Sequence, residues 1–240
     1  MYGIQLYSVR DTTPKDMEGT LRALSEMGYT SVEFAGFFGH SAETVKGWLD
    51  KYGLKASGTH TGWGEIRDRY EETVAYHKAI GCSEIIVPGA DLSTKEKLDE
   101  FIDFLNVYGK KLKEDGLHLS YHNHDREFYL NGYGVVTHEE MQKRTTADVG
   151  FEIDTYWVYR AGRDPVALMK TLADRVPVIH IKDGLQNGQG KPLGMGSAPV
   201  KEVFATAKAL GIPMVVESET LTPNGLAEAK ICIDFLKSLE

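Results

Sequence analysis

Short apolar segments alternate with longer amphipathic segments along the whole chain. The short segments predict strands at residues 2–8, 30–34, 54–59, 83–89, 117–122, 149–154, 176–182 and 213–218. The longer segments repeat apolar residues at the spacing of a helix face, and they predict helices at 14–27, 41–52, 66–80, 94–115, 137–145, 164–174, 199–210 and 223–238. This alternation indicates parallel strands joined by crossover helices.

Eight strand–helix units fill the chain, and this number favours a closed (β/α)8 barrel, the TIM barrel. The alternative is an open doubly wound sheet, which often carries a glycine fingerprint after its first strand. Here the first turn reads SVRDTTP and contains no glycine. No linker or change of composition marks a second domain. We therefore expect a single TIM-barrel domain over residues 1–240.

In such a barrel the chemistry lies where strands end and the loops to the helices begin. Side chains alternate along a strand between the barrel interior and the helix layer. In the segment 149–154, Phe151 and Ile153 suit the helix layer, so Glu152 and Asp154 point inward. The same alternation directs further side chains inward from the other three strands: Ser120, His122, His124, His180, Lys182, Glu217 and Glu219. From this set, each of strands five to eight brings one candidate ligand to the same end of the cavity: His122, Asp154, His180 and Glu217.

Two imidazoles and two carboxylates that converge at one end of one cavity predict a metal site. Taken singly, each of these residues also fits a polar rim or a salt bridge. Together they would leave costly buried charge unless a cation neutralises the carboxylates. Mixed nitrogen and oxygen ligands suit Mn²⁺, Zn²⁺, Co²⁺ or Fe²⁺ better than Ca²⁺, and Mg²⁺ stays open as well. We expect one divalent metal ion, whose identity the sequence does not select.

Charge and targeting signals narrow the classes of partner. The 240 residues carry a formal net charge of −8, which argues against a nucleic-acid or anionic-membrane partner. The N-terminal stretch MYGIQLYSVRD lacks the basic region of a signal peptide, and no apolar run approaches the roughly 18 residues of a membrane span. Two cysteines without metal-binding spacing indicate a reducing compartment. We therefore expect a cytoplasmic protein.

The motifs taken together resemble the sugar phosphate isomerase/epimerase family of the xylose isomerase-like TIM barrel superfamily, over nearly the whole chain. The segments that carry the resemblance include IQLYSVR, VEFAGFFGHSAE, SGTH, YHNHDREF, FEIDTYWVYRAGRDP and VVESE. In relatives that convert ketoses, a Glu, an Asp, a His and a Glu from strands five to eight hold one divalent metal. Asp154, His180 and Glu217 match the last three of these.

The first ligand departs from the family pattern. His122 stands where those relatives have Glu, and Trp157 stands where they have a further His. The resemblance implies that His122 replaces the carboxylate, with Glu127 or His124 as alternatives. The form of these motifs looks like a subgroup of epimerases, dehydratases or lyases that act on keto-sugars or keto-glycosides. A lyase or dehydratase is therefore the alternative to an isomerase or epimerase.

The expected reaction begins with removal of a proton from a carbon next to a carbonyl, through a metal-stabilised enediolate. Glu127 is the first candidate base, because it follows the ligand strand on a loop over the cavity. Lys182 is the second catalytic candidate, as an acid or an oxyanion partner. The alternative for Lys182 is a salt bridge with Glu152 or Asp183.

Several further residues are candidates for binding a small-molecule carbohydrate substrate. These are His60, His124, Glu33 and Trp157. The glycine-rich segment 183–199 is interpreted as a lid, with a phosphate contact through Lys191 as the alternative. An abasic-site endonuclease is disfavoured by the acidic charge. A non-catalytic barrel that binds a carbohydrate or a protein stays a third reading, and a homo-oligomer is left open.

Overall fold

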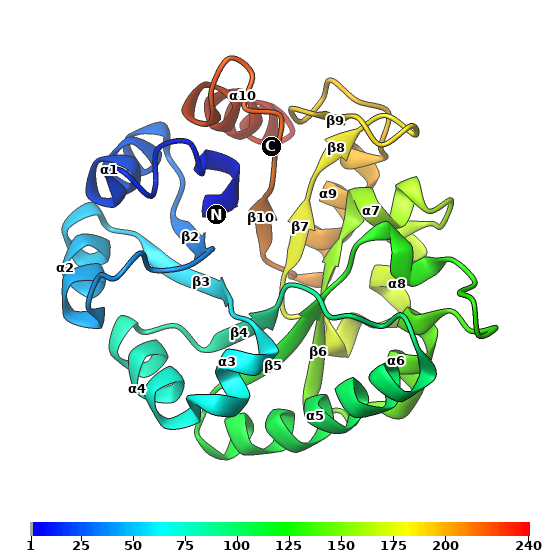
Figure 1. The fold of residues 1–240 in the computed structure, drawn as a ribbon. Helices are drawn as coiled ribbons and strands as arrows, with labels where there is room; N and C mark the ends of the chain where they lie inside the picture. The colour runs from blue at the N-terminus through cyan, green and yellow to red at the C-terminus, as the bar shows by residue number, and fades with distance from the viewer. Residues whose placement is uncertain (1) are drawn as a thin grey trace.

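Figure 1 shows the fold of the computed structural model, which describes residues 2–240. Eight parallel strands form a closed barrel in the order β1-β10-β7-β6-β5-β4-β3-β2, and pairing of β1 with β10 closes it. The barrel strands are β1 (Tyr2–Gln5), β2 (Ser31–Phe34), β3 (Lys55–His60), β4 (Glu84–Val87), β5 (His118–His122), β6 (Val149–Asp154), β7 (Ile179–Ile181) and β10 (Met214–Val216). The predicted TIM barrel is thereby confirmed.

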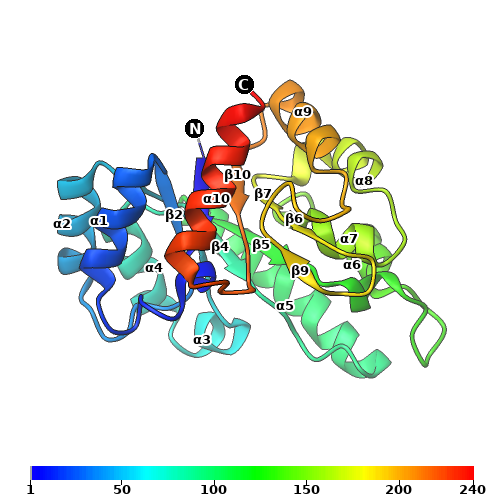
Figure 2. The same ribbon diagram turned by 90° about the horizontal axis from the view of Figure 1, so that it is seen from above.

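Helices surround the barrel, as both views show (Figures 1 and 2). The main helices are α1 (Met17–Met27), α2 (Ala42–Tyr52), α4 (Tyr70–Ile80), α5 (Lys95–Glu114), α6 (Thr137–Arg144), α8 (Pro165–Thr171), α9 (Val200–Leu210) and α10 (Gly225–Ser238). Short additional elements are η1 (Leu6–Val9), α3 (Trp63–Asp68), η2 (Asp125–Phe128), α7 (Thr155–Arg160), η3 (Ala173–Arg175) and the hairpin strands β8 (Asp183–Gly184) and β9 (Gly190–Lys191). Within residues 2–240, no helix combines the length and the apolar character needed to cross a bilayer.

Helix ends follow local capping chemistry. The Ser41 hydroxyl accepts a hydrogen bond from the backbone N–H of Thr44, and Gly53 ends the same helix with a left-handed φ of 65°. The predicted helix 66–80 is instead two helices, because the backbone leaves the helical conformation at Arg69. Helix α7 was not predicted. It begins directly after β6, because the Asp154 carboxylate caps it by accepting the N–H of Trp157.

The interior of the barrel has an apolar floor and a charged upper part. Ile86, Val178 and Val215 form a small apolar cluster that is separate from the large core between strands and helices. Buried carboxylates, imidazoles and one ammonium group lie at the carboxyl ends of the strands. The charged groups of the interior therefore gather at the end of the barrel where the strand-to-helix loops begin.

The glycine-rich segment 183–199 forms the β8–β9 hairpin, which lies between α10 and α7 in both views (Figures 1 and 2). The buried carboxylate of Asp183 accepts the backbone N–H groups of Gly184, Gly194, Gly196 and Ala198. A side chain at Gly196 would place its Cβ 2.1 Å from that carboxylate, so only glycine permits this approach. The segment predicted as a lid is therefore anchored at its base.

We predict that Asp183→Ala loosens the hairpin without unfolding the barrel. Loss of hydrogen bonds to a buried charge should cost more than about 1.4 kcal/mol of local stability, which corresponds to at least about tenfold faster amide exchange at Gly194, Gly196 and Ala198. Hydrogen–deuterium exchange measures this, with Asp234→Ala as the control, because Asp234 makes only an exposed i,i+4 pair with Lys230. Unchanged exchange in the hairpin would contradict the anchoring role.

Candidate active site

Two buried carboxylates, those of Glu33 and Glu152, link the imidazole rings of the site. Glu33 Oε1 lies 2.7 Å from His180 Nε2 and 3.1 Å from His60 Nε2, and it accepts a hydrogen bond of 2.6 Å from Gln5. Glu152 Oε2 lies 2.9 Å from His60 Nε2 and 3.1 Å from His122 Nδ1. Each ring is thus held through one nitrogen, which is Nε2 in His60 and His180 and Nδ1 in His122. These contacts fix the orientation of the rings.

The surroundings set the charge of each imidazole differently. Burial opposes protonation of His60, but the Glu33 and Glu152 carboxylates outweigh it and raise its pKa to about 9. Burial likewise opposes protonation of His180, whose pKa is nevertheless raised well above the usual value by Glu152, Glu33 and Glu217. For His122 burial dominates and lowers the pKa to about 3, so this ring is neutral.

Lys182 occupies the upper part of the site, and its side chain is only 1% exposed. Its Nζ lies 2.9 Å from Glu217 Oε2, 2.5 Å from Glu219 Oε2 and 3.6 Å from Asp154 Oδ2. Burial works against its charge, but Glu217 and Asp154 raise its pKa, so the group is a cation. Its carboxylate partners are therefore not the two that the sequence suggested, Glu152 and Asp183.

The structure brings all four sequence-predicted ligand residues together. One donor atom from each of His122, Asp154, His180 and Glu217 lies within 4.8 Å of the others. Two of their buried atoms, Asp154 Oδ2 and His180 Nδ1, accept or donate no hydrogen bond. His180 Nδ1 lies 3.4 Å from Glu217 Oε2 without hydrogen-bond geometry. Unpartnered buried polar atoms are costly, so this donor set fits a bound cation.

In a second group, one donor atom from each residue likewise lies within 4.8 Å of the others; its members are His60, His122, Glu152 and His180. In this group, however, Glu152 Oε2 is hydrogen-bonded to two imidazoles, and His60 bridges Glu152 and Glu33. These contacts resemble the carboxylate–histidine pairs that orient metal ligands from behind. We therefore interpret His60 and Glu152 as residues that orient the ligands His122 and His180, and not as ligands of a second metal.

The candidate substrate-binding residues lie at three positions. His60 and His124 line a cavity of about 380 Å³, here called the central cavity, together with Tyr7, His122, Glu217 and Glu219. The Trp157 ring covers Lys182, whose Nζ lies 4.6 Å from the ring centre. Glu33 lies deeper, fully buried beneath the imidazoles, and reaches the site only through His60 and His180.

Glu127, the predicted base, is not brought to the central cavity. Its carboxylate accepts hydrogen bonds from the Tyr121 hydroxyl, the His124 backbone N–H and the Arg126 guanidinium, at distances between 2.8 and 3.0 Å. The side chain is buried and lines a different pocket, beside Trp63 and Asn131. Its contacts are those of a capping residue for η2, so this position does not support a catalytic role.

The sequence did not indicate one residue that takes part in the site. Gln5 donates a hydrogen bond to Glu33, and its signal was present, because its neighbours Ile4 and Leu6 are apolar and buried. Glu219 was predicted to point inward but received no role; it pairs with Lys182 at the rim of the central cavity.

The closed barrel, with a polar site at the carboxyl ends of its strands, defines a TIM-barrel protein. Residues 21–239 match the family described as xylose isomerase-like TIM barrel, which confirms the resemblance noted above. The chain therefore belongs to the xylose isomerase-like TIM barrel family.

Two similar proteins carry enzyme names. An inosose dehydratase of Mesomycoplasma hyopneumoniae is 27% identical over 191 residues, which cover 68% of this chain and 61% of that protein. This chain thus spans less than two thirds of the length of that relative. The crystal structure of a sugar phosphate isomerase/epimerase from Parabacteroides distasonis has a TM-score of 0.86 and 26% identity, covering 98% of this chain and 96% of that one.

A third neighbour is the IOLI protein, whose crystal structure contains a zinc atom. It has a TM-score of 0.77 with 12% identity, covering 99% of this chain and 97% of that chain. At this identity the likeness concerns the fold alone.

We predict that Glu152→Gln destabilises the protein strongly, because the substitution removes the negative charge shared by His60, His122 and His180. Breaking a buried ion network by removing one partner costs about 3–5 kcal/mol. Urea unfolding at neutral pH measures the loss, and Glu139→Gln on the exposed face of α6 serves as a control that should stay within about 0.5 kcal/mol. Equal stabilities of the two variants would contradict this account of the network.

Proposed function

We propose that this protein is a divalent-metal-dependent isomerase or epimerase that removes a proton next to the carbonyl of a keto-sugar or sugar derivative. The observation that carries the proposal is the convergence of His122, Asp154, His180 and Glu217 with two buried donor atoms left without partners. Family membership and the named relatives support an enzyme that acts on a small carbohydrate.

The charges in the site favour a dication over protons. Glu33, Glu152 and Glu217 are buried carboxylates, Lys182 is the buried ammonium group among them, and burial raises the pKa of the Asp154 carboxyl to about 7. Without a metal, His60 and His180 supply the remaining positive charge as imidazolium ions, consistent with their raised pKa values. His180 would have to lose its proton at Nδ1 to act as a ligand, so metal affinity should weaken as the pH falls.

The four residues would hold Mn²⁺, Zn²⁺, Co²⁺, Fe²⁺ or Mg²⁺. When bound, such an ion supplies Lewis acidity that stabilises negative charge developing on a substrate's carbonyl oxygen. The chain's own contribution is orientation. Glu152 holds Nδ1 of the neutral His122, which leaves Nε2 as its available ligand atom, and Glu33 holds Nε2 of His180, which leaves Nδ1.

We assign proton removal to His124 rather than to Glu127. The His124 ring lines the central cavity, beside His122 and Glu217. Burial lowers the pKa of His124, so the ring is neutral and able to accept a proton at neutral pH. Lys182 is the complementary acid, because it is a buried cation paired with Glu217 and Glu219, which both line the same cavity, and its ammonium group can donate to a substrate oxygen.

A keto-sugar lyase or dehydratase is the second candidate. A buried ammonium group beside the cavity suits protonation of a leaving oxygen, which elimination requires and epimerisation does not. The relatives named inosose dehydratase favour the same reading. Both reactions share the first step, so the experiments below test that step.

The first experiment measures metal binding by equilibrium dialysis against Mn²⁺, Zn²⁺ and Co²⁺, followed by metal analysis. We expect one ion per chain. Asp154→Asn and Glu217→Gln should each weaken binding by more than about 100-fold, since loss of an outer partner alone costs 10- to 100-fold. Glu84→Gln is the matched control, because Glu84 is a buried barrel carboxylate that pairs with Ser120 and His118 instead. Binding that is absent, or insensitive to these ligand variants, would support the non-catalytic barrel.

The second experiment follows solvent deuterium uptake by ketoses, keto-glycosides and inososes with the metal-loaded protein. Uptake at the carbon beside the carbonyl is expected, and His124→Ala should slow it by about 10²–10⁴-fold, the usual contribution of a general base. Glu127→Gln tests the competing assignment and should leave uptake nearly unchanged. If Glu127→Gln abolishes uptake while His124→Ala retains it, the roles are reversed. No uptake by any substrate would argue against the enediolate step.

A further inference from the structure

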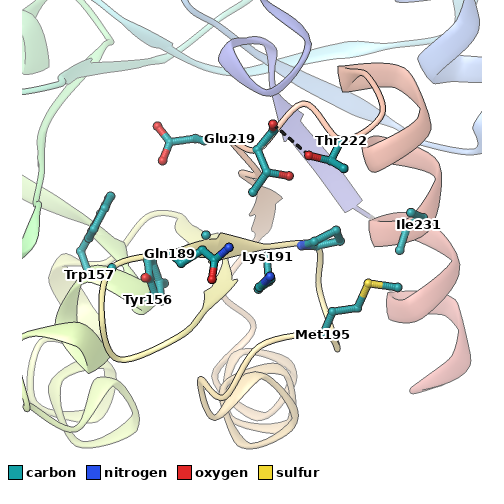
Figure 3. Close-up of a pocket in the computed structure, with 12 residues that line it drawn as sticks. Tyr156, Trp157, Gln189, Lys191, Met195, Glu219, Thr222 and Ile231 are labelled. Atoms are coloured by element: carbon teal, nitrogen blue, oxygen red, sulfur yellow. Dashed lines mark hydrogen bonds between the residues drawn. The ribbon is translucent and has the colours of Figure 1, made fainter.

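A second cavity of about 670 Å³ adjoins the central cavity, and we call it the side cavity. It lies between the β8–β9 hairpin and the loop from β10 to α10 (Figure 3). Glu219 lines both cavities. Trp157 lines the side cavity and also approaches the central cavity, where its ring centre lies 5.9 Å from that of His124. The two spaces therefore meet at Glu219 and Trp157.

Buried carboxylates fix both walls of the side cavity. Asp183 anchors the hairpin through four backbone N–H groups. Glu228, which is fully buried in α10, accepts hydrogen bonds from the Ser218 hydroxyl and from the backbone N–H groups of Thr220 and Thr222 in the opposite loop. Because both walls are held by the protein itself, the cavity is formed before any ligand binds.

The lining of the side cavity combines apolar and hydrogen-bonding surfaces. Figure 3 shows Trp157 at one end and Met195 and Ile231 at the other, with Gln189 and Lys191 on the hairpin between them. An aromatic face and apolar side chains suit the face of a ring, while the amide and the ammonium group suit hydroxyl groups at its edge.

The charge of the lining disfavours a phosphate group. Lys191 is the one cation among the described residues that line the side cavity, and the Glu219 carboxylate lines it as well. Phosphate sites usually combine several positive groups or backbone N–H donors with no competing carboxylate. A neutral, hydroxylated or aromatic ring satisfies the lining better.

We propose that the side cavity binds a second ring attached to the reacting keto-sugar, so that the preferred ligands are two-ring glycosides. The proposal rests on the proposed function for the identity of the reacting half. The central cavity, at about 380 Å³, has room for one sugar ring, and the larger side cavity accepts the second. The bond that joins the rings then passes Glu219 and its partner Lys182.

The test is calorimetric titration of the metal-loaded and metal-free protein with cellobiose, glucose and glucose 6-phosphate. Wild-type protein is expected to bind cellobiose at least about tenfold more tightly than glucose, a difference of about 1.4 kcal/mol. Ile231→Trp fills the side cavity and should remove this preference while leaving glucose affinity unchanged. Leu210→Trp, on the exposed end of α9, is the control and should behave as wild type.

The proposal is overturned if cellobiose binds no more tightly than glucose, if neither binds, or if Ile231→Trp keeps the preference. A preference for glucose 6-phosphate that Lys191→Met removes would assign the cavity to a phosphate and would equally overturn the proposal. Failure of the proposed function is distinguished by deuterium uptake from single-ring ketoses. Uptake without two-ring preference refutes the side-cavity proposal alone, whereas two-ring preference without uptake refutes the reaction alone.

Discussion

The arrangement of the site depends on how its buried negative charge is neutralised. Glu33, Glu152, Asp154 and Glu217 lie within one closed cylinder, where the cost of unpaired charge is high. Lys182 neutralises part of this charge, and the imidazoles can neutralise more by taking up protons. A divalent ion would replace those protons. The same carboxylates thus stabilise the empty site through protonated histidines and prepare it for a metal.

Closure of the barrel is what allows so many charged groups to face one another. Each strand contributes only one or two inward side chains near its end, and parallel register places these ends at one level. Asp154 shows how local structure adds to this arrangement. One of its oxygens caps α7, which fixes the carboxylate, and the other faces the site without a hydrogen bond. The start of α7 thereby holds the side chain of this candidate metal ligand in place.

The sequence was informative wherever side-chain direction follows from strand periodicity. Alternation along β5, β6, β7 and β10 predicted which residues face inward, and the four candidate ligands do converge. Periodicity ends with the strand, so the direction of Glu127 was not predictable in the same way. After His122 the chain turns into η2, and Glu127 folds back to cap that helix rather than to cover the cavity. The pairing of Lys182 with Glu217 and Glu219 was missed because alternation gives the direction of a side chain but not the neighbour that its charged group reaches.

Loop structure explains why the chemistry and the choice of ligand can be separated in this fold. The candidate metal and proton-transfer groups lie at the strand ends or one to two residues beyond them, so the barrel determines where they are placed. The side cavity is built from loops, whose shape depends on two carboxylates that do not touch the central cavity, Asp183 and Glu228. A change in either loop alters what fits beside the reacting ring without moving His122 or Asp154. The motifs of the strands therefore identify the family, while the size of the ligand has to be inferred from the loops.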